Sequence, residues 1–350
     1  MLRQMTLKNF TVFSDATFDF AEGLNVVVGE NGAGKSHVLK AAYTVAAVSA
    51  WGEKDSGSSL PTKSYLETAM AKKLRGVFRP DDLGRLTRRQ QGVTKCKVEV
   101  RFKTTSLRIA FSFHTKSKTE VAIDTLPTKW EGRPPVFLPT RELLTIYPGF
   151  VSLYETTELP FEETWKDTCI LLGAPLARGP RLPEIGDLLK PLEEQLDGKV
   201  VLDDGRFYLN TKKTGNIEAH LVAEGLRKLA MIARLIATGS LIGTGSLFWD
   251  EPEANLNPKV IKRVAKTILQ LCQSGIQVFV ASHSLFLLRE LDILLKSNEF
   301  FDVDARFFGL HPSDSGVIVQ QGETVDDIGT IDALQEELSQ SDRYLASEST

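Results

Sequence analysis

The chain has 350 residues, of which 42% are hydrophobic and 25% charged, and its formal net charge is -3. This composition is ordinary for a globular protein with a sizeable core. The length allows two average domains or one large domain with insertions. With a small negative net charge, the molecule as a whole is not an obvious binder of polyanions.

The start of the chain and its apolar runs argue against a membrane protein. The start, MLRQMTLKNF, has no long apolar stretch behind its basic residues, so we expect no signal peptide. No apolar run approaches the roughly 18 to 20 residues that span a bilayer. Cys96, Cys169 and Cys272 are scattered and lack metal-ligand spacing, which fits a reducing cytoplasm best. We therefore expect a cytoplasmic protein that does not itself bind a membrane.

The stretch VVVGENGAGKSHVLKAA, residues 26–42, predicts a buried strand over 24–28, a glycine-rich turn and an alanine-rich helix over 36–48. Its turn satisfies the pattern G-x-x-x-x-G-K-S with Gly29, Glu30, Asn31, Gly32, Ala33, Gly34, Lys35 and Ser36. Glycines let the backbone aim successive N–H groups at phosphate oxygens, and the helix start adds its dipole. We expect Lys35 to bridge the β- and γ-phosphates and the Ser36 hydroxyl to ligate Mg²⁺. The pattern predicts a triphosphate site.

Polar and then basic residues follow. Residues 51–64 are small, polar and turn-forming, which predicts a flexible loop. Residues 72–97 hold nine basic side chains and two aspartates, so the net charge of this segment is +7. Such a segment is either a footprint for a nucleic-acid backbone, a solvated face or a docking patch for an acidic partner.

The middle of the chain alternates between strand and helix patterns. Residues 96–124 alternate apolar and polar side chains, which predicts antiparallel strands. Residues 150–200 read as helices with proline breaks, and 199–211 as a hairpin that turns at Asp204-Gly205. An apolar stripe over 226–236 predicts an amphipathic helix that opens just after Glu224-Gly225.

A second apolar strand, over 246–249, ends in Asp250-Glu251. Carboxylates at the C-terminal end of such a strand lie at the ligand edge of a parallel sheet. We expect Asp250 to hold Mg²⁺ through water and Glu251 to polarise the attacking water. An ordinary polar turn is the alternative, and the phosphate-binding pattern argues against it.

Asn257-Pro258 is expected to start a helix that runs to about residue 274. The apolar strand that follows, over 276–284, carries His283 at its end, where an imidazole can hydrogen-bond a γ-phosphate. A helix, two short strands and a final amphipathic helix are predicted after it.

In this order, the parts resemble the ABC-class ATPases, and the RecF, SMC, Rad50 and OLD-type branch more than the transporter branch. The opening LKNFTVFSDATFDFAEGLNVVVGENGAGKS resembles the N-terminal strands and Walker A of that branch. DEPEANLNP resembles its Walker B and D-loop, and ASHS its H-loop. Within the branch, the chain is most similar to compact AAA-type ATPases of bacterial anti-phage defence systems.

The resemblance implies an α/β fold, an ABC-class P-loop NTPase head with a mainly parallel core sheet, an antiparallel β-subdomain and an inserted helical subdomain. We expect one ATPase head over 1–350. Its expected parts are the N-terminal strands and Walker A (1–50), the basic segment and β-subdomain (51–135), the helical subdomain with its hairpin (136–220), the signature helix to H-loop (221–311) and a C-terminal strand and helix (312–350).

The resemblance also implies that two heads sandwich two ATP molecules, in a homodimer or a higher homo-oligomer. Each site would then receive Glu224 and Gly225 of the signature, and Asn255 of the D-loop, from another copy. Ala223 stands where the family usually has serine. The Q-loop glutamine is not evident, and Arg141 or Glu142 would have to substitute for it.

Three functions follow. The leading one is a slow ATPase switch that controls a separately encoded effector, a nuclease or toxin, in anti-phage defence. The second is a RecF-like DNA-repair or replication ATPase that acts directly on DNA, with residues 72–97 as its footprint. The third is the ATPase subunit of a transporter.

Overall fold

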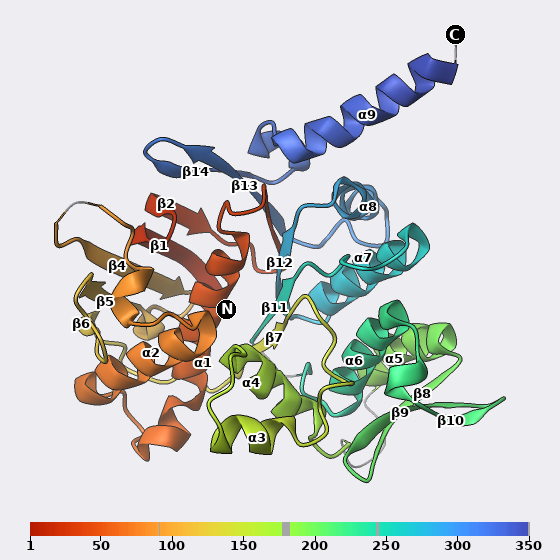
Figure 1. Ribbon diagram of the computed structural model, residues 1–350, viewed down its shortest axis with the longest axis horizontal. Coiled ribbons are helices and arrows are strands. Elements are labelled where there is room, and N and C mark those ends of the chain that lie inside the picture. Colours follow the sequence, from red (N-terminus) through yellow and green to blue (C-terminus); the bar gives the residue numbers. More distant parts are fainter. Residues whose placement is uncertain (91, 177–182, 243–244, 349–350) are drawn as a thin grey trace.

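A mainly parallel sheet forms the centre of the protein, with strand order β14-β13-β3-β12-β11-β7 (Figure 1). The computed structural model describes residues 1–90, 92–176, 183–242 and 245–348. The strands are β3 (Leu24–Gly29), β7 (Val136–Leu138), β11 (Ser246–Asp250), β12 (Gln277–Ser282), β13 (Ala305–Ser313) and β14 (Gly316–Gly322). β14 pairs antiparallel with β13, and the other neighbours pair in parallel. The predicted mainly parallel sheet is confirmed.

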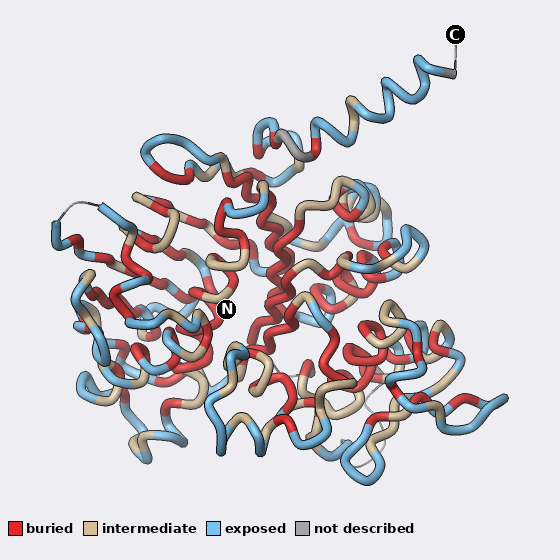
Figure 2. Tube along the Cα trace, in the orientation of Figure 1, coloured by how far each residue is buried: buried red, intermediate tan, exposed pale blue. Residues whose placement is uncertain are grey.

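Both faces of this sheet are buried. Val26 and Val28 pack into one hydrophobic cluster, with Trp249, while Val27 packs into the other, with Phe248. Figure 2 shows the central strands as buried along their length. A parallel sheet covered on both faces needs apolar side chains at consecutive positions, which explains the uninterrupted apolar runs that predicted these strands.

An antiparallel sheet, with strand order β2-β1-β4-β5-β6, lies beside the central sheet and shares a core with α1 and α2. Its strands are β1 (Leu2–Phe10), β2 (Phe13–Asp19), β4 (Lys95–Phe102), β5 (Ile109–His114) and β6 (Ala122–Thr125). The helices are α1 (Lys35–Ser56) and α2 (Lys63–Phe78), and η1 (Leu83–Leu86) and η2 (Thr105–Leu107) are short 3-10 turns. The predicted antiparallel strands are confirmed.

The prediction of a flexible loop over 51–64 is wrong in its first part, because α1 continues to Ser56. Gly52 lies so close to Trp130 that a Cβ there would come within 2.2 Å of its ring. The indole Nε1 of Trp130 donates a hydrogen bond to the Ser58 carbonyl at 2.8 Å. This packing overrides the weak helix propensity of the small polar residues.

A helical subdomain with a small meander follows β7. It contains α3 (Phe150–Thr156), α4 (Glu163–Leu172), α5 (Pro183–Leu196), β8 (Gly198–Asp203), β9 (Arg206–Thr211), β10 (Gly215–Glu218) and the turn η3 (Ala219–Leu221). Asp204 and Gly205 both have positive φ, 44° and 70°, as a tight hairpin turn requires. The predicted hairpin is confirmed.

The remaining helices complete the head. They are α6 (Glu224–Ala237), α7 (Pro258–Gln273), α8 (Leu285–Leu295) and α9 (Asp332–Glu348), with η4 (Val325–Ile328) before α9. The Asn257 side chain caps α7 by accepting from the Val260 N–H at 3.1 Å, as its position before Pro258 predicts. α9 extends away from the body (Figure 1). None of the helices in the described ranges is both long and apolar enough to cross a membrane.

A buried ionic cluster fastens α4 to α1 and α2. The Lys73 Nζ on α2 donates to Asp167 at 2.6 Å and to Glu163 at 3.1 Å, both on α4. The Tyr43 hydroxyl on α1 donates to the same Asp167 carboxylate at 2.6 Å. Because Lys73, Asp167 and Tyr43 are buried, each of these groups depends on its partners.

Replacing Asp167 with asparagine is expected to lower the free energy of unfolding by about 2 kcal/mol, because a charge-assisted hydrogen bond to a buried lysine is lost. Urea denaturation measures this change. Glu299→Gln, which removes the exposed partner of Lys266 at 2.9 Å, is the control and should cost less than about 1 kcal/mol. Equal effects of the two variants would contradict the role of the buried cluster.

Candidate nucleotide-binding and catalytic site

Three of the sequence motifs meet at one edge of the central sheet. In the parallel register, Val28 of β3 lies opposite Ser282 of β12, and Ala281 of β12 lies opposite Asp250 of β11. The glycine-rich turn, the ASHS segment and the Asp-Glu pair therefore leave adjacent strands at the same level. This carboxyl edge is where ligands bind in open α/β sheets.

The glycine-rich turn has the shape of a phosphate cradle. Gly32 and Gly34 have φ of 84° and 95°, which residues with a Cβ rarely adopt. A Cβ on Gly34 would also come within 2.6 Å of Val12, whereas the space beside Gly32 is open. Asn31 is exposed and Ala33 is buried, with its N–H bonded to the Glu30 carbonyl at 3.2 Å. The open side of the turn suits the close approach of a phosphate.

Lys35, the first residue of α1, lies inside this turn. Its Nζ donates to the Gly29 and Glu30 carbonyls at 2.9 and 3.0 Å. Burial lowers the pKa of Lys35, and the carboxylates of Glu251 and Asp250 oppose this shift. The ammonium is therefore held at the phosphate loop and can exchange carbonyl oxygens for phosphate oxygens.

Ser36 and Asp250 lie together, and their donor set fits Mg²⁺. The Ser36 hydroxyl lies close enough to the Asp250 carboxylate to lower its pKa. Asp250 is 9% exposed, and its Oδ1 is a buried atom without a hydrogen bond. Burial raises the pKa of Asp250 to about 6, while Ser36 and Lys40 oppose the shift. An unsatisfied carboxylate oxygen next to a hydroxyl matches the oxygen ligands that Mg²⁺ takes beside a nucleotide.

Glu251 and His283 contact each other directly. The Glu251 Oε1 lies 3.1 Å from the His283 Nδ1, and both side chains remain partly open to solvent. Glu251 has a φ of 47°, in the left-handed region, and its N–H donates to the Ala281 carbonyl at 2.9 Å. This sharp turn brings the carboxylate back over the end of β12. The two predicted catalytic groups therefore lie together.

Glu253 is a buried residue that the sequence analysis missed. Its Oε1 accepts from the Ser282 hydroxyl at 2.6 Å. Burial raises its pKa, and the hydrogen bond from Ser282 opposes the shift. The third acidic residue of the segment DEPE is the sequence signal that could have pointed to Glu253. Its partner, Ser282, lies 29 residues further along the chain.

The predicted signature and D-loop residues form a second group. The Asn255 Nδ2 donates to the Glu224 carboxylate at 3.0 Å, at the start of α6. A Cβ on Gly225 would lie 3.0 Å from Leu256, so the helix start packs on the same turn. Lys228 is 1% exposed and donates to the Ala254 carbonyl at 2.6 Å. Glu224 and Gly225 therefore contact the predicted D-loop of their own chain, and within the described residues no hydrogen bond joins them to the phosphate loop.

Glu142, one of the two residues considered for the missing glutamine, points into the protein. Its carboxylate accepts from the Thr145 hydroxyl at 2.7 Å and lies 2.8 Å from the Arg227 Nε. Arg141 is exposed. Glu142 therefore connects the segment after β7 to α6, the predicted signature helix.

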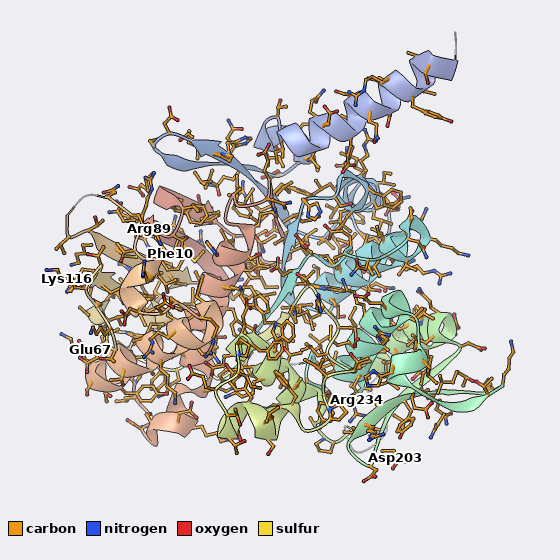
Figure 3. All side chains as sticks on the ribbon, viewed as in Figure 1. Phe10, Glu67, Arg89, Lys116, Asp203 and Arg234 are labelled. Atoms are coloured by element: carbon orange, nitrogen blue, oxygen red, sulfur yellow. The ribbon has the colours of Figure 1, made fainter. Side chains whose placement is uncertain are left out.

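The basic segment 72–97 does not form one surface. Lys73 is buried in the cluster with Asp167. Lys72, Arg75 and Arg79 line a hollow beside α4, whereas Arg85, Arg88 and Arg89 line a separate hollow of about 480 Å³ that reaches Gly32. Arg89 lies on the side of the antiparallel sheet (Figure 3). The idea of a single nucleic-acid footprint is weakened by this division, and one of the two patches borders the phosphate loop.

Two family profiles match parts of the chain. One, described as "AAA domain, putative AbiEii toxin, Type IV TA system", matches residues 175–289. Another, described as "AAA domain", matches residues 4–124. A curated relative, the "DNA double-strand break repair Rad50 ATPase" of Archaeoglobus fulgidus, is 44% identical over 41 residues, 12% of this chain. The matched segment spans 5% of that relative's length.

Solved SMC heads share the fold. One, an SMC head bound to the C-winged helix domain of ScpA, is 14% identical, with a TM-score of 0.55 over 93% of this chain and 98% of the other. Another, an Smc head with an extended coiled coil bound to the C-terminal domain of ScpA from Pyrococcus furiosus, is 11% identical, with a TM-score of 0.54 over 100% and 99%. At these identities, the likeness shows the fold alone.

Replacing Asp250 with asparagine is expected to stabilise the nucleotide-free protein near neutral pH. In the wild type, the Asp250 carboxyl binds a proton more tightly in the folded protein than in the unfolded chain. The free energy of unfolding therefore falls as pH rises from about 4 to about 6. Near pH 7, the variant avoids this loss of unfolding free energy, which is up to about 3 kcal/mol in the wild type. Urea unfolding near pH 7 and near pH 4 measures the difference, which should vanish at the lower pH. A variant that is no more stable than the wild type near pH 7 would contradict this account of the burial of Asp250.

Proposed function

Because the chain is an ABC-class P-loop ATPase head of the RecF, SMC and Rad50 type, we propose that it hydrolyses ATP and acts as a switch between an open and a closed assembly. The observation that carries the proposal is the contact of Glu251 with His283 beside the Ser36–Asp250 pair. A base, a metal site and a phosphate cradle at one sheet edge are the parts that phosphoryl transfer to water needs.

Each group has a separate task in the proposed reaction. Lys35 and the backbone N–H groups of the turn bind and orient the phosphates. Ser36 and Asp250 would hold Mg²⁺, which neutralises charge on the β- and γ-phosphates. Glu251 accepts a hydrogen bond from the attacking water and orients it for in-line attack. His283 positions the Glu251 carboxylate and hydrogen-bonds the γ-phosphate.

We propose that the assembly closes when a second copy of the chain contacts the bound ATP. The start of α6, with Glu224 and Gly225, would present backbone N–H groups to the γ-phosphate that another copy holds. Asn255 is bonded to Glu224, so the D-loop and the signature would reach that nucleotide as one unit. ATP shifts the equilibrium only if the closed form contacts it better than the open form does, and this contact across the interface supplies the difference.

The switch is proposed to control a separately encoded effector, a nuclease or a toxin, in the cytoplasm and in the setting of anti-phage defence. The match of residues 175–289 to the AbiEii-type family supports this setting. The two SMC heads are named as bound to ScpA, so heads of this fold can carry a partner protein. The setting rests on family likeness rather than on the geometry of the site.

Glu251→Gln is expected to keep ATP bound while turnover falls by about 100-fold or more, because the amide is a poor base. With ATP, it should also form a dimer at twice the 38.8 kDa of one chain, measured by light scattering. Lys35→Ala is the matched control and should neither bind ATP nor dimerise.

A Glu251→Gln variant that binds ATP and stays monomeric would contradict the sandwich of two copies. A Glu251→Gln variant that hydrolyses ATP at the wild-type rate would contradict the role of Glu251 as the base.

Direct action on DNA is a second candidate, favoured by the excess of basic residues in 72–97. Arg85 and Arg89 are exposed and line the same hollow. If they contact a DNA backbone, reversing both to glutamate should lower the affinity for DNA and flatten the slope of log K against log salt by about 2. Fluorescence anisotropy with a duplex measures this, and an unchanged slope would exclude the footprint.

A further inference from the structure

Glu253 is a buried carboxylate that the proposed reaction does not use. It is 6% exposed, and its Oε1 accepts from the Ser282 hydroxyl at 2.6 Å and from the His283 backbone N–H at 3.4 Å. Its Oε2 is a buried atom without a hydrogen bond in the described part of the chain. Burying a carboxylate with an unsatisfied oxygen destabilises a fold, so the presence of Glu253 needs an explanation.

The partners of Glu253 are His283 itself, through its backbone N–H, and the preceding residue, Ser282. Ser282, which donates to the carboxylate, also accepts from the Ser284 N–H at 3.1 Å. Ser284 in turn caps α8 by accepting from the Leu287 N–H at 3.3 Å. The end of β12, the His283 backbone and the start of α8 are therefore held by one carboxylate.

The His283 side chain depends on this backbone for its place. Its ring is 43% exposed and lies 3.1 Å from Glu251. Because the ring is only partly buried, we expect the position of its own backbone to decide whether the imidazole reaches Glu251. Ala254, next to Glu253, accepts from Lys228 of α6 at 2.6 Å, so Glu253 also lies on the path from the signature helix to His283.

We propose that Glu253 is a positioning residue for ATP hydrolysis: it fixes the His283 backbone so that the imidazole meets Glu251. Its kinetic consequence rests on the proposed ATPase function, whereas its effect on the His283 ring does not. Glu253 reaches from the turn after β11 to the end of the neighbouring strand, so it holds the two catalytic segments in one arrangement.

The first test compares Glu253→Ala with Glu253→Gln. The alanine variant should lower kcat about tenfold, because small displacements of catalytic groups have large effects on rate. KM for ATP should change by less than about twofold, because ATP binding itself is untouched. The glutamine variant should keep most of the activity, since its amide oxygen accepts the same two hydrogen bonds. Asp167→Asn, which also neutralises a buried carboxylate, should lose stability and keep kcat.

The second test asks whether Glu253 acts through His283. In a His283→Ala background, Glu253→Ala should lower kcat by no more than about twofold further, because residues that act as a unit are not additive. The proposal is overturned if alanine at 253 has its full effect without His283, if glutamine is as damaging as alanine, or if KM rises while kcat holds.

A third measurement separates this proposal from the ATPase proposal. In the nucleotide-free protein, the ring signals of His283, identified by their loss in His283→Ala, should shift in NMR spectra of Glu253→Ala and stay in place in Glu253→Gln. Unmoved signals in the alanine variant overturn the proposal, even if the wild type hydrolyses no ATP. If Glu253→Ala does not fold, Ser282→Ala replaces it, and the ring signals should again shift.

Discussion

Three carboxylates lie within four residues at the end of the buried strand β11, and the site depends on each being held by a different partner. Asp250 contacts Ser36, Glu251 contacts His283, and Glu253 contacts Ser282. Like charges this close repel one another, and burial adds to the penalty. The partners point the three groups in different directions, toward Ser36, His283 and Ser282.

Two buried lysines offset this concentration of negative charge. Lys35, in the phosphate loop, is attracted to Glu251 and Asp250. Lys228, on α6, is attracted to Glu224 and Glu253. Lys35 thus lies in the phosphate loop, and Lys228 lies on α6. Glu251 and Glu253 each attract both lysines, so these two carboxylates lie between the phosphate loop and α6 in charge terms.

Hydrogen bonds and an ion pair connect α6, the proposed signature helix, to the rest of the site. Lys228 and Asn255 connect it to the D-loop, and the Arg227–Glu142 pair connects it to the segment after β7. Arg234 donates to the carbonyls of Leu172 and Ala174, at the end of α4, at 3.0 and 2.9 Å. α4 in turn is fastened to α1. The helix that would face another copy is therefore connected to the Walker A helix within its own chain.

Much of the fold was predictable because its signals are local. The glycine-rich turn, Asp250-Glu251 and His283 each follow an apolar run, and parallel strands bring such ends to one edge. The places of Glu253 and Lys228 were not predictable, because their partners are 29 and 26 residues away along the chain. The extension of α1 and the division of the basic segment depend on packing against distant residues, such as Trp130 against Gly52.

The central claim is that a nucleotide held by the phosphate loop of one copy is completed by the start of α6 from another copy. A structure of the Glu251→Gln variant with ATP and Mg²⁺ tests it most directly. The account predicts backbone N–H groups near Gly225 within hydrogen-bonding distance of the γ-phosphate bound by the other copy. A nucleotide-bound assembly in which that helix start faces solvent, or only its own chain, would contradict it.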